Sequence, residues 1–346
     1  MSTLSFSDIS SILYENYGAK ISEGITQEGP GNWMVPDQSF IGCLRAKGRV
    51  FIGGADGNDR HPREWGIHSS TATATSIDGD DNFPAATQEG YGEASLAWTR
   101  YAVTMEFDNL VRLATRKNAA RGQMSPITED FKRKLKALVH DIEQGLATDG
   151  TGNSSKDITG FLSFLSASNT YAGLAQTGNT YWQAVVEAAG SAVLTRTHLR
   201  TMLGTLWDRG VLDDTSELWM PRQQWNRYVD LFADSIRFDN QGGSMEKAVP
   251  MYDDGVISAP IKVLPGVPST EIWCVNLGET ELRFLDHTPE DELNTIKDEE
   301  VMHEGIPVGF EQIETGKDKK AIALKAYVQL VNCTPRANGI ITGLTA

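Results

Sequence analysis

The sequence of 346 residues has few cysteines, no excess of basic residues and no long apolar run, and each absence excludes a class of protein. Its three cysteines, Cys43, Cys274 and Cys333, lie far apart and form no CxxC pair. They therefore indicate neither a disulfide framework nor a zinc site, and they suit a reducing compartment. The formal net charge of −15 argues against a general nucleic-acid-binding protein, because such proteins carry a basic surface that displaces counterions from phosphates.

Signals for export or membrane insertion are missing as well. Residues 1–20 contain no basic stretch followed by an unbroken apolar run, so they do not form a secretory signal. No window approaches about eighteen consecutive apolar residues, the length that a membrane-spanning helix needs. We therefore expect no membrane partner.

Sequence motifs for catalysis are absent too. Residues 315–318 have the wrong spacing for a phosphate-binding loop, and Pro307 would stop the helix that a zinc-binding HExxH motif at His303 requires. The six histidines show no ligand spacing. Aspartate-rich turns at 56–59 and 78–81 fit either solvated turns or loose calcium binding, and we favour the former. We predict that the chain is not an enzyme and has no catalytic, cofactor-binding or metal-binding residues.

The strongest positive signal is a long amphipathic helix at 126–148. Ser125 and Pro126 favour its start, and Gly150 favours its end. Apolar residues recur between them at spacings of three and four, which predicts one buried face: Ile127, Phe131, Leu135, Leu138, Val139, Ile142 and Leu146. A helix of this length extends about 33 Å, so it predicts a spine on which other layers rest.

Before this helix, strand patterns alternate with turn-rich interruptions. Short strands are predicted at 49–52 and within 65–75, and the clearest strand at 99–107, where apolar and polar residues alternate. An isolated hairpin buries little surface, yet residues 65–98 carry four aromatic residues: Trp65, Phe83, Tyr91 and Trp98. Either a neighbouring subunit or the chain's own body would cover them, and we favour the neighbour.

The second half of the chain alternates strands and helices. Helices are predicted at 195–208 and 223–232, and strands at Ser216–Met220, 257–264, 271–276, 281–285 and 321–331. The succession from 195 to 285 predicts a compact α/β unit. We expect Trp207, Trp219 and Trp225 to lie in its core.

Three stretches carry a resemblance to a known family. The first is Ile142 to Gly152 with Ile158-Thr159-Gly160-Phe161-Leu162, and the second is Leu218-Trp219-Met220-Pro221-Arg222-Gln223-Gln224-Trp225. The third runs from Ile322 through Thr334-Pro335-Arg336-Ala337 to Ile340-Ile341-Thr342-Gly343. In type and order they resemble the spine-helix turn, the strand–Asn-Pro–helix unit and the final strand of the major capsid proteins of tailed phages. Met220 stands where the family usually has Asn.

The resemblance implies an α+β fold of the Hong Kong 97 type, built from named parts. Residues 1–35 would form an N-arm, and 36–100 an extended E-loop β-hairpin and its base. Residues 101–194 would form a P-domain with the spine helix 126–148 and a β-sheet. Residues 195–304 would form an α/β A-domain, and 305–346 would return to the P-domain as a strand and C-terminal tail.

The resemblance also implies a function. The chain would be a coat protein that assembles as homo-pentamers and homo-hexamers into an icosahedral shell. The shell would enclose double-stranded DNA, contacted non-specifically, in a virion assembled in the host cytoplasm. A separate scaffolding protein, a portal and a decoration protein would be its partners, and no cofactor is expected. The alternative is an encapsulin-like nanocompartment shell that encloses enzyme cargo.

Overall fold

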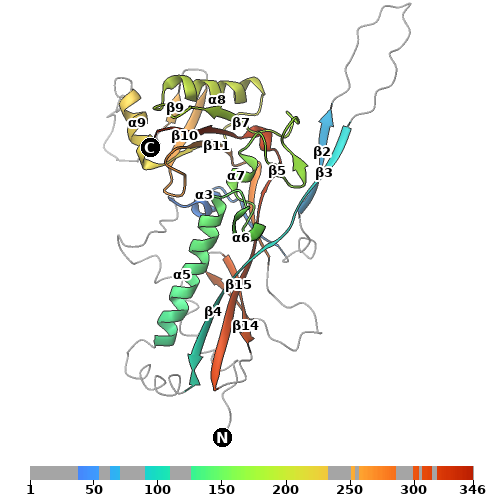
Figure 1. Ribbon diagram of the computed structural model, residues 1–346, viewed down its shortest axis with the longest axis vertical. Helices are drawn as coiled ribbons and strands as arrows, with labels where there is room; N and C mark the ends of the chain where they lie inside the picture. The colour runs from blue at the N-terminus through green and yellow to red at the C-terminus, as the bar shows by residue number, and fades with distance from the viewer. Residues whose placement is uncertain are drawn as a thin grey trace, which may run out of the picture.

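The computed structural model describes residues 38–53, 63–70, 90–109, 126–232, 251–253, 257–285, 299–303, 306–313 and 318–345. Two six-stranded sheets follow one another along the long axis of the molecule. A long helix lies beside one sheet, and a two-stranded hairpin projects from the body (Figure 1). This combination of helices and sheets confirms the predicted α+β class. The expected N-arm, 1–35, lies outside the described residues.

The first sheet is organised around its longest strand, β15 (Lys319–Asn332). This strand pairs antiparallel with β4 (Thr99–Asp108), with β14 (Ile306–Ile313) and, further along, with β12 (Thr280–Leu285). Strand β1 (Val50–Gly53) lies beside β12, and β13 (Glu299–His303) lies beside β14. The predicted alternation along β4 is confirmed, since exposed residues alternate with buried or half-buried ones.

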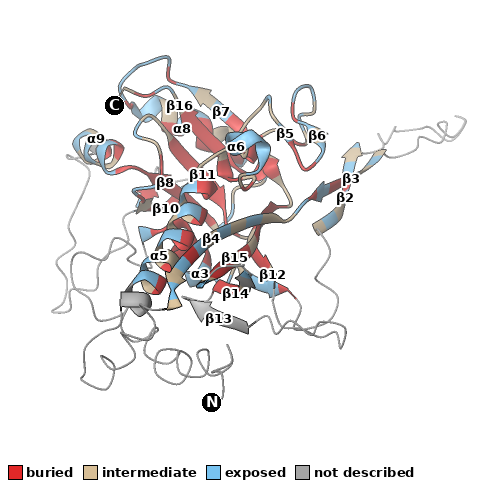
Figure 2. Ribbon diagram, turned by 60° about the horizontal axis from the view of Figure 1, so that its bottom comes forward, coloured by how far each residue is buried: buried red, intermediate tan, exposed pale blue. Residues whose placement is uncertain are grey.

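Helix α5 (Pro126–Leu146) is the predicted spine, and it ends two residues earlier than expected. Its apolar face packs on the first sheet, where the Phe131 ring lies 5.5 Å from that of Phe310. Figure 2 shows the buried stripe along one side of α5. The predicted face is buried at Phe131, Leu135, Leu138, Val139, Ile142 and Leu146. The side chain of Ile127 lies outside the described part.

The second sheet has the strand order β7-β16-β11-β8-β10-β9. Its strands are β7 (Val185–Ala188), β8 (Ser216–Met220), β9 (Met251–Asp253), β10 (Ser258–Val263), β11 (Ile272–Asn276) and β16 (Gly339–Thr342). Helix α8 (Arg196–Asp208) begins at its N-cap Thr195 and packs on β7 and β16. Helix α9 (Arg222–Phe232) follows β8 directly. All five residues of β8 are buried, as the sequence predicts.

Sheet membership differs from the expected division at 195–304 and 305–346. Strands β12 and β13 fall within 195–304 but belong to the first sheet, whereas β7 and β16 fall outside that range and belong to the second. The second sheet therefore lacks β12, which lies inside the predicted α/β unit over 195–285, and it includes β7 and β16, which lie outside that range. Local periodicity predicts strands and does not predict which strands pair, so the sequence pattern could not show this difference.

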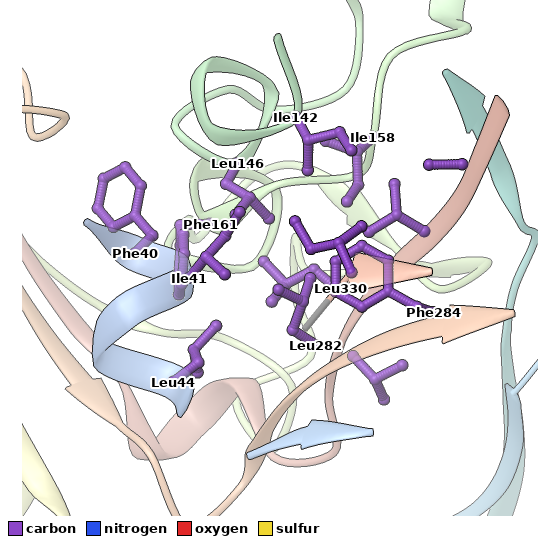
Figure 3. Packing of buried hydrophobic residues seen from close by; sticks show 14 of the residues in the cluster. Phe40, Ile41, Leu44, Ile142, Leu146, Ile158, Phe161, Leu282, Phe284 and Leu330 are labelled. Carbon is purple, nitrogen blue, oxygen red and sulfur yellow. The ribbon is translucent and has the colours of Figure 1, made fainter. Parts of the chain in front are cut away.

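A short helix, α3 (Phe40–Ala46), lies where the two sheets meet. Its Phe40 ring lies 5.6 Å from Trp219 and 5.6 Å from Trp273 of the second sheet. The same ring lies 5.2 Å from Phe161, which begins α7 (Phe161–Phe164). Figure 3 shows Ile41 of α3 beside Leu146 of α5 and Phe161. One apolar cluster therefore joins α3, α5 and both sheets.

The three tryptophans expected in the core have different positions. Trp219 is fully buried, and Trp225 is half-buried against Tyr228, with ring centroids 5.6 Å apart. The prediction for Trp207 is wrong, because its side chain is 54 % exposed. Leu199, Met202, Leu203 and Leu206 form the buried face of α8. Trp207 follows Leu206 by one residue, about 100° around the helix, and so points away from that face.

The short elements between α5 and β7, and before β16, complete the fold. They are α6 (Gly152–Ser155), β5 (Thr170–Tyr171), β6 (Leu174–Ala175) and the 3-10 helix η3 (Pro335–Ala337). Two-stranded pairing joins β5 to β6. The projecting hairpin consists of β2 (Arg63–Ser70) and β3 (Gly90–Leu96).

Candidate assembly surfaces

The hairpin β2–β3 has two different faces, which follow from its antiparallel register. Trp65 lies opposite Ala94, and Ile67 lies opposite Gly92, so these residues share one face. Ala94 is fully buried and Ile67 nearly so. The Trp65 ring lies 6.4 Å from that of Trp182 in the body. The inner face of the hairpin therefore packs on the chain's own body.

Hydrogen bonds fix the base of the hairpin to that body. The Ser95 N–H donates to the carbonyl oxygen of Ala172 at 3.1 Å. The Gln329 side-chain amide in β15 donates to the carbonyl of Leu96. The base of the hairpin is thereby held in a fixed direction while its far end projects from the body (Figure 1).

The outer face of the hairpin lies open to solvent in the described part of the chain. It carries Glu64, Gly66, His68, Tyr91, Glu93 and Ser95. All are exposed, and Tyr91 is 75 % exposed. The Tyr91 and His68 rings lie 5.4 Å apart as a cross-strand pair. Tyrosine is one of the residues enriched in protein–protein interfaces, so the exposed Tyr91 makes this face a candidate contact with a partner.

The expectation for the four hairpin aromatics has a different outcome for each residue. Trp65 packs on the chain's own body, which contradicts the neighbour interpretation for this residue. Tyr91 is exposed, and Trp98 is half-buried. Phe83 lies outside the described residues.

A second candidate surface is the outer side of α5. Its exposed residues are Asp130, Arg133, Ala137, Asp141 and Gln144, and Lys132, Lys134 and Lys136 beside them are half-buried. This polar side of the spine therefore carries charges of both signs.

The end of α5 is shaped by glycines from the first family-like stretch. A Cβ on Gly160 would lie 2.5 Å from the carbonyl oxygens of Leu146 and Thr148 and 2.6 Å from that of Gly145. Gly150 has a φ of +81°, a left-handed conformation that supplies the turn after the helix. The 158–160 segment thus docks against the last turn of α5, and only glycine fits at position 160.

Two carboxylates, which the sequence analysis missed, hold the junction between the sheets. The first is Glu143 of α5, which accepts hydrogen bonds from the backbone N–H groups of Phe40 and Ile41, the latter at 3.2 Å. Burial raises the pKa of Glu143 to about 7, against the lowering effect of these two donors. Glu143 therefore caps the first turn of α3 from a distant helix.

The second carboxylate is Glu217 of β8, which is buried and only 1 % exposed. Its oxygens lie 3.2 Å from Lys47 Nζ and 3.4 Å from Lys262 Nζ, and one accepts a hydrogen bond from Trp219 Nε1 at 3.1 Å. Lys47 is the C-cap of α3, so this ion triad fixes the other end of the same helix. The only signal in the sequence was a carboxylate directly before the apolar run Leu218-Trp219-Met220.

The described residues offer little for chemistry. No three histidine, cysteine, aspartate or glutamate side chains among them gather closely enough to hold a metal ion. His198 pairs with Glu187 at 3.1 Å and is therefore satisfied structurally. The aspartate-rich turns at 56–59 and 78–81 lie outside the described ranges. None of the described helices is long and apolar enough to cross a membrane.

Comparisons with known proteins show which proteins share this architecture. A family model described as SU10 major capsid protein matches residues 64–305. The structure is similar to the capsid asymmetric unit of cyanophage A-1(L), with a TM-score of 0.68 and 17 % identity over 86 % of this chain and 91 % of that one. It is also similar to the capsid of an empty GTA particle, with a TM-score of 0.55 and 10 % identity over 91 % and 92 %. These likenesses confirm the predicted fold of phage capsids.

A weaker likeness is to the holo-SrpI encapsulin complex from Synechococcus elongatus PCC 7942. Its TM-score is 0.46 at 10 % identity, over 74 % of this chain and 78 % of that one. This TM-score is too low to support a functional assignment. No curated protein matches the sequence.

Proposed function

The chain belongs to the SU10 major capsid protein family, and from that premise we propose that it forms the pentamers and hexamers of an icosahedral shell around double-stranded DNA. Membership makes it a structural component of a virion shell that associates with copies of itself. Pentamers, hexamers and DNA are the proposed details, and so are assembly in the host cytoplasm and a separate scaffolding protein, portal and decoration protein.

The exposed outer face of the hairpin carries the proposal. The Tyr91 ring lies 5.4 Å from that of His68 there, and 75 % of Tyr91 is exposed to solvent within a single copy. A neighbouring copy in a ring would cover it, since a heterologous contact repeated about a five- or six-fold axis closes on itself.

The division into parts is also a proposal, revised by the sheets. The P-domain would consist of α5 and the first sheet, including β12 and β13. The A-domain would consist of the second sheet with α8 and α9, including β7 and β16. The hairpin would be the E-loop. The apolar cluster around α3 contains side chains from both sheets, which supports a rigid junction between the two proposed domains.

The acidity of the chain is compatible with packaged DNA that moves freely inside the shell. An interior without a broad basic surface binds phosphate weakly, so packaged DNA would slide along it without sequence preference. No catalytic step is proposed.

Expression with and without the scaffolding protein, followed by sedimentation and electron microscopy, tests the proposal. We expect shells, tubes or isolated capsomers, and nucleic acid in particles recovered from infected cells. A species that stays monomeric at every concentration and with its scaffold would contradict it. Particles that hold a protein cargo and no nucleic acid would favour the nanocompartment alternative instead.

A further inference from the structure

Two arginines lie together between the end of α8 and the 3-10 helix η3. Arg209 is the C-cap of α8, and its Nη1 donates to the backbone oxygens of Gln183 at 2.9 Å and Arg336 at 3.4 Å. Arg336 lies in η3. Burial and the nearby charge of Arg336 together lower the pKa of Arg209. The two positive charges are thus close enough to repel each other.

Neither arginine has an acidic partner among the described residues. No ion pair joins Arg209 or Arg336 to a carboxylate there, and Asp208, adjacent in sequence, is exposed and unbonded to both. Arg336 Nε is shielded from solvent and has no hydrogen-bond acceptor. A guanidinium donor in that position loses its hydration without compensation, which is costly for a charged group.

Three cations near the junction have a carboxylate close by, whereas Arg63 Nε, like Arg336 Nε, is shielded from solvent without an acceptor. Lys47 and Lys262 share the Glu217 carboxylate. Arg49 donates to two backbone carbonyls and lies 3.9 Å from Glu281. In the part of the chain that the structure describes, no carboxylate neutralises the Arg209–Arg336 pair.

We infer that Arg209 and Arg336 receive a carboxylate of a neighbouring copy of this chain, bound between the two guanidinium groups. A carboxylate matches the guanidinium fork and would turn their repulsion into two charge-assisted interactions. Every copy brings 46 acidic residues against 31 basic ones, so the surface of a second copy is a ready source. Phosphate of nucleic acid fits less well, because it would require a broader basic surface than two side chains. The inference rests on the proposed self-assembly and names one of its contacts.

Zero-length crosslinking of the Arg336→Lys variant tests the contact directly. Carbodiimide joins an amine to a carboxylate that touches it, so the introduced lysine is a reporter that keeps the positive charge. Light and nitrogen-15-labelled subunits are mixed before assembly, and the crosslinked peptides are read by mass spectrometry. We expect peptides that join the introduced lysine of one isotope to an aspartate or glutamate of the other, in particles and not in dissociated subunits.

A second variant tests the energetic role of the site. Arg336→Gln removes the charge, and Arg200→Gln is the matched control, since Arg200 is an exposed arginine on the same helix α8. We expect Arg336→Gln to lower the yield of assembled particles about tenfold at an unchanged melting temperature of the subunit, and the control to assemble as the native chain does.

The outcomes separate this inference from the proposed function. Particles of Arg336→Lys in which the introduced lysine is crosslinked only within its own chain or not at all, or full assembly of Arg336→Gln, would overturn the inference and leave the shell function standing. Loss of packaged DNA from Arg336→Gln particles at normal yield would identify phosphate as the ligand and also overturn it. A native chain that forms no particles would contradict the proposed function itself.

Discussion

The backbone N–H of Phe40 donates a hydrogen bond to the side-chain carboxylate of Glu143, joining α3 to the spine helix across 103 residues of sequence. The same carboxylate also binds the next N–H, that of Ile41. The start of α3 is therefore held by a distant helix as well as by its own N-cap, Ser39. This relationship fixes the junction from which the hairpin and both sheets extend.

Glu143 makes the stability of the unassembled chain depend on pH. Its pKa is about 7 in the folded chain against an ordinary value of 4.5, so the folded state binds this proton more tightly than the unfolded state. The stabilisation from this proton is complete below the unfolded pKa and is lost as the pH rises through about 7. The shift corresponds to about 3 kcal/mol, and Glu143→Gln removes the titration.

Urea unfolding of native and Glu143→Gln subunits at about pH 5, 6, 7 and 8 measures this effect. We expect the free energy of unfolding of the native chain to fall relative to the variant across this range. Parallel pH profiles for the two proteins would contradict the assignment.

Gly160→Ala should destabilise the fold strongly. Its new Cβ would collide with three backbone carbonyl oxygens at the end of α5, and backbone cannot move aside cheaply. We expect a loss of more than about 2 kcal/mol in the free energy of unfolding. The matched control is Gly204→Ala in α8, where a Cβ meets nothing within 4 Å, and it should stabilise the chain by about 0.5–1 kcal/mol. Equal effects of the two variants in thermal and urea unfolding would disprove this interpretation of the helix end.

Removing the Glu217 carboxylate should be costly. Glu217→Ala leaves Lys47, Lys262 and the Trp219 indole N–H without their shared acceptor, and breaking a buried ion group in this way costs about 3–5 kcal/mol. Glu106→Ala is the comparison, because its ion pair with Lys319 at 2.7 Å joins two half-exposed side chains and should contribute little. Calorimetric unfolding of both variants decides the matter, and a near-neutral Glu217→Ala would show that the triad does not hold the junction.

The two faces of the hairpin should respond to mutation in opposite ways. Trp65→Ala removes packing against Trp182 and should lower the melting temperature of the subunit. Tyr91→Ala removes an exposed ring and should leave the melting temperature unchanged while reducing particle yield about tenfold or more. Differential scanning calorimetry and sedimentation measure the two properties separately. Normal assembly of Tyr91→Ala would remove the outer face from the interface.

Local periodicity in the sequence was enough to predict the elements that lie along a single apolar face. The spine α5, helix α8 and the alternating strand β4 occur within a few residues of their expected ends, because each repeats its burial pattern over two or more turns or pleats. Strand β8 was predicted from a short continuous apolar run instead, and all five of its residues are buried. Trp207 was assigned wrongly because one residue of helical phase separates a buried position from an exposed one.

What the sequence could not predict depends on contacts between distant segments. Strand β12 joins β15 and strand β16 joins β11, and no local pattern records either partnership. Glu143 and Glu217 look like ordinary surface carboxylates until α3 is placed against them. The Arg209–Arg336 pair likewise arises only when α8 and η3 meet.

A reconstruction of the assembled particle at side-chain resolution tests the central claim most directly, namely that the projecting hairpin of each copy is completed by its neighbour. We expect the outer face at Tyr91, His68, Glu64 and Glu93 to lie against the adjacent copy within each five- or six-fold ring, with the Tyr91 side chain buried there. A particle in which that outer face remains open to solvent, or a chain that forms no ring, would contradict the account.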